Sequence, residues 1–290
     1  MPNYTYPDID PLDAAVKNKL EITAHEDFEI LSAALIAARA AEIIEGEGPA
    51  GTFDADHLKA IHRHLFQDVF ERAGRTRNEP VRLSDGTVAT EPVLRKIDGR
   101  PFMPGKLIAP ALRRVAATLR KSNCLRGLSR AAFATGAADI MVEINGIHPF
   151  REGNGRTQRA FIRELAKQAG HELDFSVVTR ERMVLVSIAG NDHGDPAMMR
   201  RMFTEITDPV RVAALAKALD SLGRLNFPWN DHYVATAEPG HKVEVTLAGM
   251  AGDQFMARTT SEIMIGQVSD LPQPCPARGE TFTFEPSSWA

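Results

Sequence analysis

The stretch HPFREGNGRTQR, residues 148–159, decides how the rest of this sequence is interpreted. It places a histidine, an acid, three arginines and two glycines within twelve positions. The run that follows it has apolar residues at helical spacing and ends at Gly170. We therefore expect a glycine-containing loop that leads directly into the N-terminus of a helix.

Gly153, Asn154 and Gly155 occupy the point where this loop meets the helix. Such a loop presents backbone N–H groups to an anion, and the helix dipole adds to the attraction. Arg156 and Arg159 are three residues apart, so both project from one side of the first turn, where guanidinium groups can bind further phosphate oxygens. The pattern predicts a polyphosphate site.

Two further side chains complete the candidate site. Glu152 offers the kind of oxygen ligand that Mg²⁺ takes beside phosphate oxygens. His148 can accept a proton near pH 7 and is the candidate general base. Each feature alone is weak, because a single histidine is usually structural, arginines usually lie on solvated faces, and Gly-Asn-Gly is a common loop. Together they supply phosphate positioning, charge neutralisation and proton removal.

The same stretch matches the HxFx(D/E)GNGRxxR signature of the Fic family without a mismatch, and the sequence resembles that family. The resemblance implies an all-α core and transfer of AMP from ATP to a Ser, Thr or Tyr hydroxyl of a target protein. It implies His148 as base, Phe150 as the buried anchor of the loop and Glu152 on Mg²⁺. It also implies Gly153, Asn154 and Gly155 around the α- and β-phosphates, with Arg156 and Arg159 on the phosphate chain.

Fic proteins also carry a hairpin flap that aligns the target by main-chain pairing, and TVATEPVLRKIDG, residues 87–99, holds the matching place. Two turn signals flank a β-branched segment there, with Pro92 at an edge. The alternative interpretation of this segment is an ordinary surface hairpin with no role in target binding. The residues expected to line the target register and the nucleotide rim are Leu94, Arg95, Lys96 and Ile97. Asn191 is expected to hydrogen-bond the adenine edge.

The wider pattern predicts a mainly α Fic fold with a β-hairpin flap, followed by a small antiparallel, OB-like β barrel. Helices are expected at about 26–45, 57–70, 106–121, 129–145, 155–169, 179–190 and 195–206. Four or five short strands are expected beyond residue 229. The domains are then 1–210 for the catalytic domain, 211–228 for a connector and 229–290 for the β domain.

Regulation and delivery follow only from resemblance. Many Fic proteins carry an inhibitory helix with (S/T)xxxE(G/N); the nearest match, AEIIEG, has Ala41 four residues before Glu45. This departure favours inhibition in trans by a small antitoxin-like protein, or none. A Fic domain followed by a strand-rich module resembles the type IV-secreted effectors of Bartonella, which implies a bacterial cytoplasmic protein delivered into the host cytoplasm. These effectors end in a third, secretion-signal domain; the residues up to Ser288-Trp289-Ala290 do not include one, so we expect this sequence to be a shortened form.

Composition limits the alternatives. The 290 residues are 43% hydrophobic with a net charge of −4, and residues 229–290 hold three Lys or Arg against eight Asp or Glu, so nucleic acid is an unfavourable partner. We expect no membrane span, and the two cysteines suggest neither a zinc site nor a disulfide framework. Two functional alternatives stay open: a Fic enzyme that transfers UMP, phosphocholine or phosphate, and a non-catalytic Fic docking module. The target protein, the modified residue type and the oligomeric state are not encoded in any pattern we find.

Overall fold

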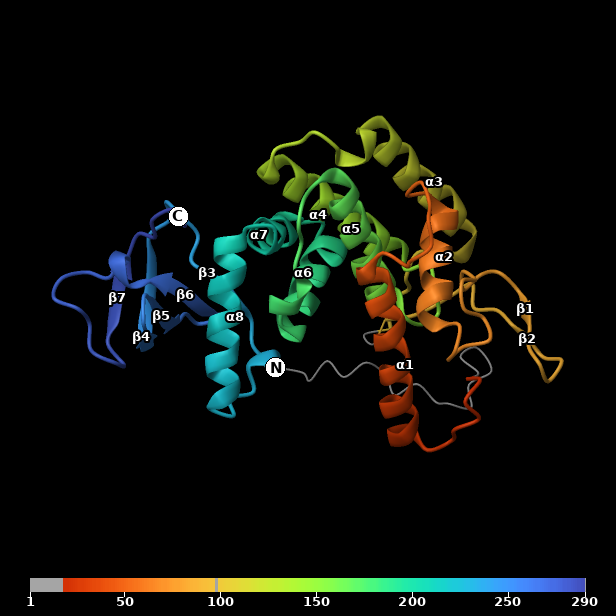
Figure 1. The fold of residues 1–290 in the computed structure, drawn as a ribbon, viewed down its shortest axis with the longest axis horizontal. Helices are drawn as coiled ribbons and strands as arrows, with labels where there is room; N and C mark the ends of the chain where they lie inside the picture. Colours follow the sequence, from red (N-terminus) through yellow and green to blue (C-terminus); the bar gives the residue numbers. More distant parts are fainter. Residues whose placement is uncertain (1–17, 97–98, 290) are drawn as a thin grey trace. The chain divides into compact units, whose positions relative to one another are not determined.

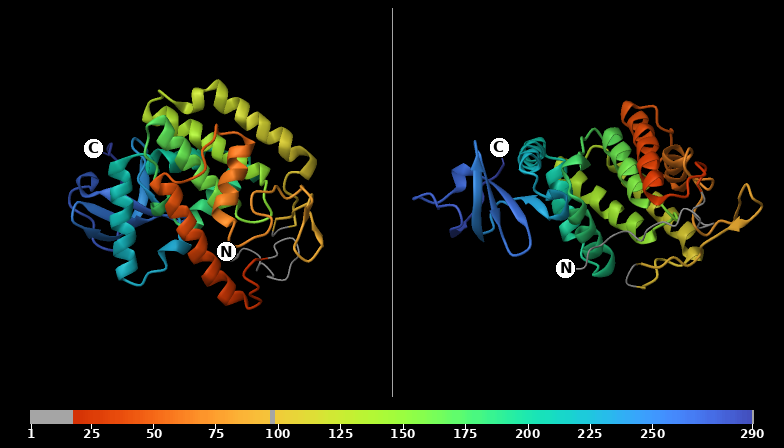
Figure 2. Two further views of the ribbon diagram at one scale, coloured as in Figure 1. Left: turned by 45° about the vertical axis from the view of Figure 1, so that its right-hand side comes forward. Right: turned by 90° about the horizontal axis from the view of Figure 1, so that it is seen from below.

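The computed structural model describes residues 18–96 and 99–289, and it divides into two compact units. The first compact unit holds the described residues up to Gly127 together with Ile140–Gly170. The second holds Leu128–Asp139 and the described residues from His171 onward. Figures 1 and 2 show the helices and strands along the chain.

The first unit is mainly helical, as predicted. Its helices are α1 (His25–Glu45), α2 (Ala55–Phe66), α3 (Gly105–Lys121), the second half of α4 (Arg130–Ile147) and α5 (Asn154–Ala169), with the short η2 (Asn123–Leu125) after α3. These confirm the predicted helices within a few residues at each end. Figure 1 shows α1 and α2 as neighbours.

Local sequence explains where these helices begin and end. The Asp54 side chain accepts a hydrogen bond from the N–H of His57 at 2.9 Å and so caps α2. Gly46 and Gly170 end α1 and α5 in the left-handed conformation that glycine adopts without a Cβ clash. The buried face of α2 packs against α5, where the Phe53 and Phe161 rings meet edge-on at 5.4 Å.

The flap region differs in detail from the single hairpin predicted over residues 87–97. One short hairpin pairs β1 (Val81–Arg82) with β2 (Val88–Ala89) around the Ser84-Asp85-Gly86 turn. A second, smaller one is marked by an antiparallel bridge between Arg95 and Pro101. The Ser84-Asp85-Gly86 turn closes the first hairpin, and residues 90–94 connect it to the segment that holds the second pairing.

The second unit combines helices with a sheet. Its further helices are α6 (Arg180–Asp192), α7 (Ala197–Ile206) and α8 (Pro209–Arg224), with the short η3 (Phe175–Val177), η4 (Trp229–Asp231) and η5 (Val268–Asp270). The predicted connector at 211–228 therefore folds largely as α8, which Asp208 caps by accepting from the N–H of Val210 at 3.0 Å. Asp208-Pro209 is a favourable helix start because proline at the first position loses no hydrogen bond.

Five strands form one sheet in the order β3-β6-β5-β4-β7, running from β3 at one edge to β7 at the other. The strands are β3 (Val234–Thr236), β4 (Val243–Ala251), β5 (Gln254–Arg258), β6 (Ile263–Gln267) and β7 (Thr281–Phe284). Three of the pairings are antiparallel as predicted, but β3 pairs with β6 in parallel. The consecutive strands β4, β5 and β6 form an antiparallel meander. Strand β3 pairs with β6, the last strand of that meander, and not with β4, the next strand in the sequence.

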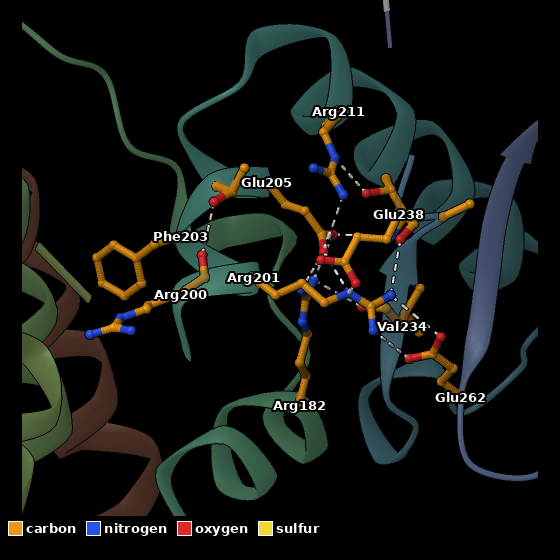
Figure 3. A network of polar contacts seen from close by, with 12 residues as sticks. Arg182, Arg200, Arg201, Phe203, Glu205, Arg211, Val234, Glu238 and Glu262 are labelled. Atoms are coloured by element: carbon orange, nitrogen blue, oxygen red, sulfur yellow. Dashed lines mark hydrogen bonds and ion pairs between the residues drawn. The ribbon is translucent and has the colours of Figure 1, made fainter. Parts of the chain in front are cut away.

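Buried ionic groups join the helices of the second unit to its sheet (Figure 3). The Glu205 carboxylate of α7 is fully buried and accepts from Arg182 of α6 at 2.7 and 3.0 Å. Arg211 of α8 lies 3.5 Å from the same carboxylate, and its Nε donates to the Thr236 hydroxyl of β3 at 2.7 Å. Arg201 reaches Glu262 at 3.2 Å. Arg201 also lies 3.6 Å from Glu205, so three arginines share one buried carboxylate and tie α6, α7 and α8 to β3.

None of the helices in the described part of the chain is long and apolar enough to cross a membrane.

Candidate active site

The predicted site lies in the first compact unit, in the loop between the end of α4 and the start of α5. Asn154, the first residue of α5, holds this loop closed through its buried side-chain amide. Its Oδ1 accepts from the Phe150 N–H at 2.9 Å and its Nδ2 donates to the Phe150 carbonyl at 2.8 Å. These two bonds use the amide oxygen and one of the two amide N–H donors to hold the main chain of the loop at Phe150.

Phe150 is the buried anchor that the family resemblance implied. It is 1% exposed, and its ring stacks on the imidazole of His62 from α2 with centroids 3.9 Å apart. His62 accepts from the Gly74 N–H at Nδ1 (2.8 Å), so its proton is on Nε2, which donates to the Glu152 carbonyl at 3.0 Å. His62 therefore fixes the main chain at Glu152, a role that sequence reasoning missed.

The N-terminus of α5 is open for an anion. Gly153 precedes the helix with φ +79, in the left-handed region, and no side chain caps the first turn. The first N–H groups of a helix lack intrahelical partners, so those at the start of α5 point out of its end. A Cβ on Gly153 would lie 2.3 Å from the Phe66 ring, so only glycine fits here. Gly155 continues the nest inside the first turn.

Both predicted arginines lie beside this helix end. The Gly155 Cβ position is 3.4 Å from Nη1 of Arg159, which brings that guanidinium against the nest. Arg156 is exposed and lies over the Phe66 ring at 5.6 Å from its centroid. Two cations and the helix dipole thus act on the same end of α5, which suits a ligand with several negative charges.

Glu152 lies at the edge of the nest and is partly exposed. One of its carboxylate oxygens accepts from the Gly153 N–H at 3.1 Å, which leaves most of its acceptor capacity. No group of three or more His, Cys, Asp or Glu able to hold a metal occurs within the described residues. A single carboxylate beside a phosphate site fits Mg²⁺, which is usually held by one or two carboxylates plus substrate oxygens.

His148 stands at the end of α4 with φ +48, a left-handed conformation that is uncommon for a residue with a Cβ. Its ring stacks on Phe102, centroids 3.9 Å apart and planes 15° apart. Although part of the residue remains exposed, burial lowers the pKa of His148 to about 3, with the positive charge of Arg77 as the next cause. The Asn145 carbonyl opposes this shift. The imidazole is therefore neutral at pH 7 in this structure.

The flap lies against this histidine through Phe102, whose N–H donates to the Leu94 carbonyl at 2.9 Å. The Lys96 N–H donates to the Arg100 carbonyl at 2.8 Å, and its ammonium lies 5.5 Å from the Phe102 ring centroid. Since N–H and C=O groups alternate in direction along a strand, those of Arg95 point to the opposite, open edge. Leu94 is buried, so only its main chain can meet a ligand, and Ile97 lies outside the described residues.

Two other predicted residues are not brought to this loop by any contact described. Asn191 is partly exposed near the end of α6, in the second compact unit, and its role in adenine recognition stays a prediction. Glu45 ends α1, where the Cβ position of Gly46 is 3.5 Å from Nζ of Lys167 near the other end of α5. Lys167 follows Arg159 by two turns, about 12 Å along the helix axis.

Comparison with known proteins gives the family. Residues 52–166 match the Fic/DOC family. A protein adenylyltransferase of Bartonella henselae is 36% identical over 221 residues, which cover 76% of this chain and 41% of that protein. The type IV secretion system effector protein BepA has a structure with a TM-score of 0.85, 33% identity and coverage of 96% of this chain and 95% of that one. This chain belongs to the Fic/DOC family.

Similar structures solved with a nucleotide include two effector proteins of Bartonella, one with AMPPNP and one with ADP. The second is the N-terminal Fic domain of a VirB-translocated effector protein from Bartonella quintana with bound ADP. Its TM-score is 0.65, with 39% identity and coverage of 71% of this chain and 95% of that one. This chain spans about two fifths of the length of the Bartonella henselae relative, since the match covers 41% of that protein.

Proposed function

We propose that this chain is a protein adenylyltransferase that moves AMP from Mg·ATP to a Ser, Thr or Tyr hydroxyl of a target protein. One observation supports the proposal most: the uncapped N-terminus of α5 carries a left-handed glycine, two arginines and a carboxylate, while a neutral imidazole ends the preceding helix. This constellation suits a triphosphate next to an incoming alcohol. Relatives that carry the name protein adenylyltransferase add to that support.

The chemistry follows from these residues. The target hydroxyl oxygen attacks the α-phosphorus of ATP, and the bond from that phosphorus to the oxygen bridging to the β-phosphorus breaks. His148 takes the hydroxyl proton on its neutral imidazole. The nest N–H groups, Arg156 and Arg159 hold the negative charge of the departing pyrophosphate. Glu152 would hold Mg²⁺, which supplies further charge neutralisation at the phosphates when it is bound.

The flap is proposed to align the target. Arg95 offers its main-chain N–H and C=O at an open edge, where an extended segment of a target protein can add as a further strand. Lys96 and the main chain of Leu94 would form the inner side of that register, next to Phe102 and His148. The hydroxyl is thereby brought to the imidazole.

Regulation and delivery are proposed on separate grounds. Ala41 stands where the inhibitory motif of Fic proteins has Ser or Thr, and this departure supports inhibition in trans by a small antitoxin-like protein over inhibition by Glu45. Similarity to BepA supports synthesis in a bacterial cytoplasm and delivery into host cytoplasm by type IV secretion. We further propose that the five-stranded sheet is an OB-like module for docking to protein, since its acidic composition disfavours nucleic acid.

The test is incubation of this chain with labelled ATP and Mg²⁺ in a host-cell lysate, followed by mass spectrometry for AMP on hydroxyl side chains. We expect AMP on protein with the wild-type chain and strongly reduced AMP transfer with His148→Ala. Parallel reactions with UTP and CDP-choline separate the alternative donors. Modification from one of those donors and not from ATP would reject AMP transfer while keeping the site.

A further inference from the structure

Arg77, just before the flap, is completely buried, yet the hydrogen bonds described for its side chain go to main-chain carbonyls alone. Its Nε donates to the carbonyl of His148 at 2.9 Å. Its Nη1 donates to the carbonyl of Pro92 at 3.0 Å, and its Nη2 to that of Met103. One guanidinium thus holds the main chain of the proposed base and the two ends of the flap segment between Pro92 and Met103.

The main chain of Arg77 repeats the same connection. Its N–H donates to the Pro149 carbonyl at 2.8 Å, next to His148, and its carbonyl accepts from the Glu91 N–H at 2.7 Å, next to Pro92. Backbone and side chain therefore both bridge the loop after α4 and the start of the flap. Two independent links of this kind fix the distance between the two segments more tightly than either alone.

We propose that Arg77 is a positioning residue for the transfer reaction, which holds the His148 imidazole and the flap in one geometry so that base and target hydroxyl meet. The proposal rests on the proposed function. His148 has the left-handed φ of +48, which persists only where the surroundings hold it, and the Arg77 Nε bonds the carbonyl of that very residue. Displacement of a reacting group by about 1 Å can cost around 100-fold in rate.

Charge gives a second consequence that can be measured. The charged groups that act on His148 are Arg77, Lys96 of the flap and Arg151 of the loop, with the Asn145 carbonyl opposing them. Burial lowers the pKa of Arg77 and Glu91 opposes that shift, but the guanidinium remains charged at neutral pH. Removal of this charge should raise the pKa of His148, whereas a lysine in its place should keep that pKa low.

The experiment uses Arg77→Lys and Arg77→Met in the full chain, with Leu119→Ala as matched control. Leu119 is completely buried near the end of α3 in the same compact unit and contacts neither the flap nor the loop in any interaction described. NMR of the His148 imidazole gives its titration midpoint without any need for activity. Calorimetry with Mg·ATP gives nucleotide affinity, and labelled ATP with lysate protein gives the transfer rate.

A positioning role predicts a distinct set of results. Arg77→Lys keeps the positive charge but loses the planar guanidinium that donates to several carbonyls at once. The rate of AMP transfer should therefore fall about 10- to 100-fold, while the affinity for Mg·ATP stays within about twofold of the wild-type value. Arg77→Met should in addition move the His148 midpoint upward. Leu119→Ala should lower the melting temperature but leave the midpoint and the transfer rate per folded molecule unchanged.

Other results would overturn the proposal. They are wild-type transfer by Arg77→Lys, an unmoved His148 midpoint in folded Arg77→Met, or a loss of transfer in Leu119→Ala equal to that in Arg77→Lys. If Arg77→Met does not fold, Arg77→Lys alone decides, through its ratio of transfer to nucleotide affinity. Absence of AMP transfer by the wild-type chain would reject the proposed function, and the NMR titration would still test whether Arg77 acts on His148.

Discussion

Arg77 and Arg182 are both completely buried, one in each compact unit, but their partners differ. Arg182 donates twice to the Glu205 carboxylate, whereas Arg77 donates to main-chain carbonyls of the flap and of His148. Burial would lower the pKa of Arg182, but Glu205 outweighs it and raises that pKa. For Arg77, burial dominates and the pKa is lowered.

The difference shows two uses of a buried cation. In the second unit the Glu205 carboxylate neutralises the charge of Arg182 directly. The ionic network there joins helices α6, α7 and α8 to strand β3. In the first unit the charge has only carbonyl dipoles as direct partners, so its field extends to the neighbouring imidazole of His148. We therefore expect mutations at the two places to differ in kind: loss of stability in one and altered chemistry in the other.

Removal of the shared carboxylate should have the largest effect on stability. Glu205→Gln leaves the buried Arg182 and its neighbours Arg201 and Arg211 without their common anion. Breaking a buried pair from one side typically costs about 3 to 5 kcal/mol, so we expect a loss of that size in the free energy of unfolding of the second unit. Urea unfolding followed by Trp229 and Trp289 fluorescence measures it. A loss under about 1 kcal/mol would show that the network carries little of the stability of this unit.

Loss of the imidazole should be the next largest effect, and it should be purely chemical. His148→Ala is expected to lower the AMP transfer rate by roughly 10²- to 10⁴-fold, the usual contribution of a general base. Nucleotide affinity should hold, because the nest is formed by Gly153 and the residues after it. Transfer kinetics and calorimetry with Mg·ATP separate the two quantities. Full transfer by this variant would remove His148 from the mechanism.

The contrast between the arginines also marks what could be predicted from sequence. The helices of the first unit and most strands were predicted well, because apolar period acts locally, whereas α8 was predicted as a connector although Asp208 caps its start. The site residues between His148 and Arg159 were predicted because they are contiguous. Arg77 was missed, since nothing in RTRNEP distinguishes it from a solvated arginine until carbonyls 14 to 71 residues away surround it.

Other misses have the same origin. His62 carried a weak signal, because it follows Ile61 on the buried face of α2 between Leu58 and Leu65, but its partner Glu152 is 90 residues away. The parallel pairing of β3 with β6 likewise depends on where the chain re-enters the sheet rather than on either strand. Contacts between residues so far apart in the sequence produce no local pattern of apolar residues from which they could be predicted.

A test at the main chain should give a smaller effect than either substitution above. Gly153→Ala forces a methyl group into a left-handed position and to within 2.3 Å of the Phe66 ring. We expect a loss of about 1 to 2 kcal/mol in stability from the backbone alone, and weaker Mg·ATP binding because the nest is displaced. Gly155→Ala is the matched control, since its Cβ meets only the flexible end of Arg159 at 3.4 Å. Equal stability loss in both variants would argue against a special requirement at Gly153.

The smallest effect should come from a buried histidine that has no cationic role. His57 accepts from the Phe53 N–H at Nδ1, lies 3.0 Å from the Pro49 carbonyl at Nε2, and is 5% exposed. Burial lowers its pKa, against the opposing effects of the Pro49 carbonyl, Asp54 and Glu164. Between that lowered pKa and about 6.5, the unfolded chain binds more protons at His57 than the folded chain does. The free energy of unfolding therefore decreases as the pH falls through this window, and the full contribution of His57 to stability is present above about pH 6.5.

His57→Gln can keep one acceptor and one donor on this side chain without a titrating proton. The decrease in unfolding free energy between pH 7 and pH 5 should therefore be smaller in His57→Gln than in the wild-type chain, with no change in the His148 titration. Urea unfolding at both pH values measures this difference. An identical decrease in the two proteins would mean that His57 is protonated as readily in the folded state as in the unfolded one, and burial would then not be keeping this imidazole neutral.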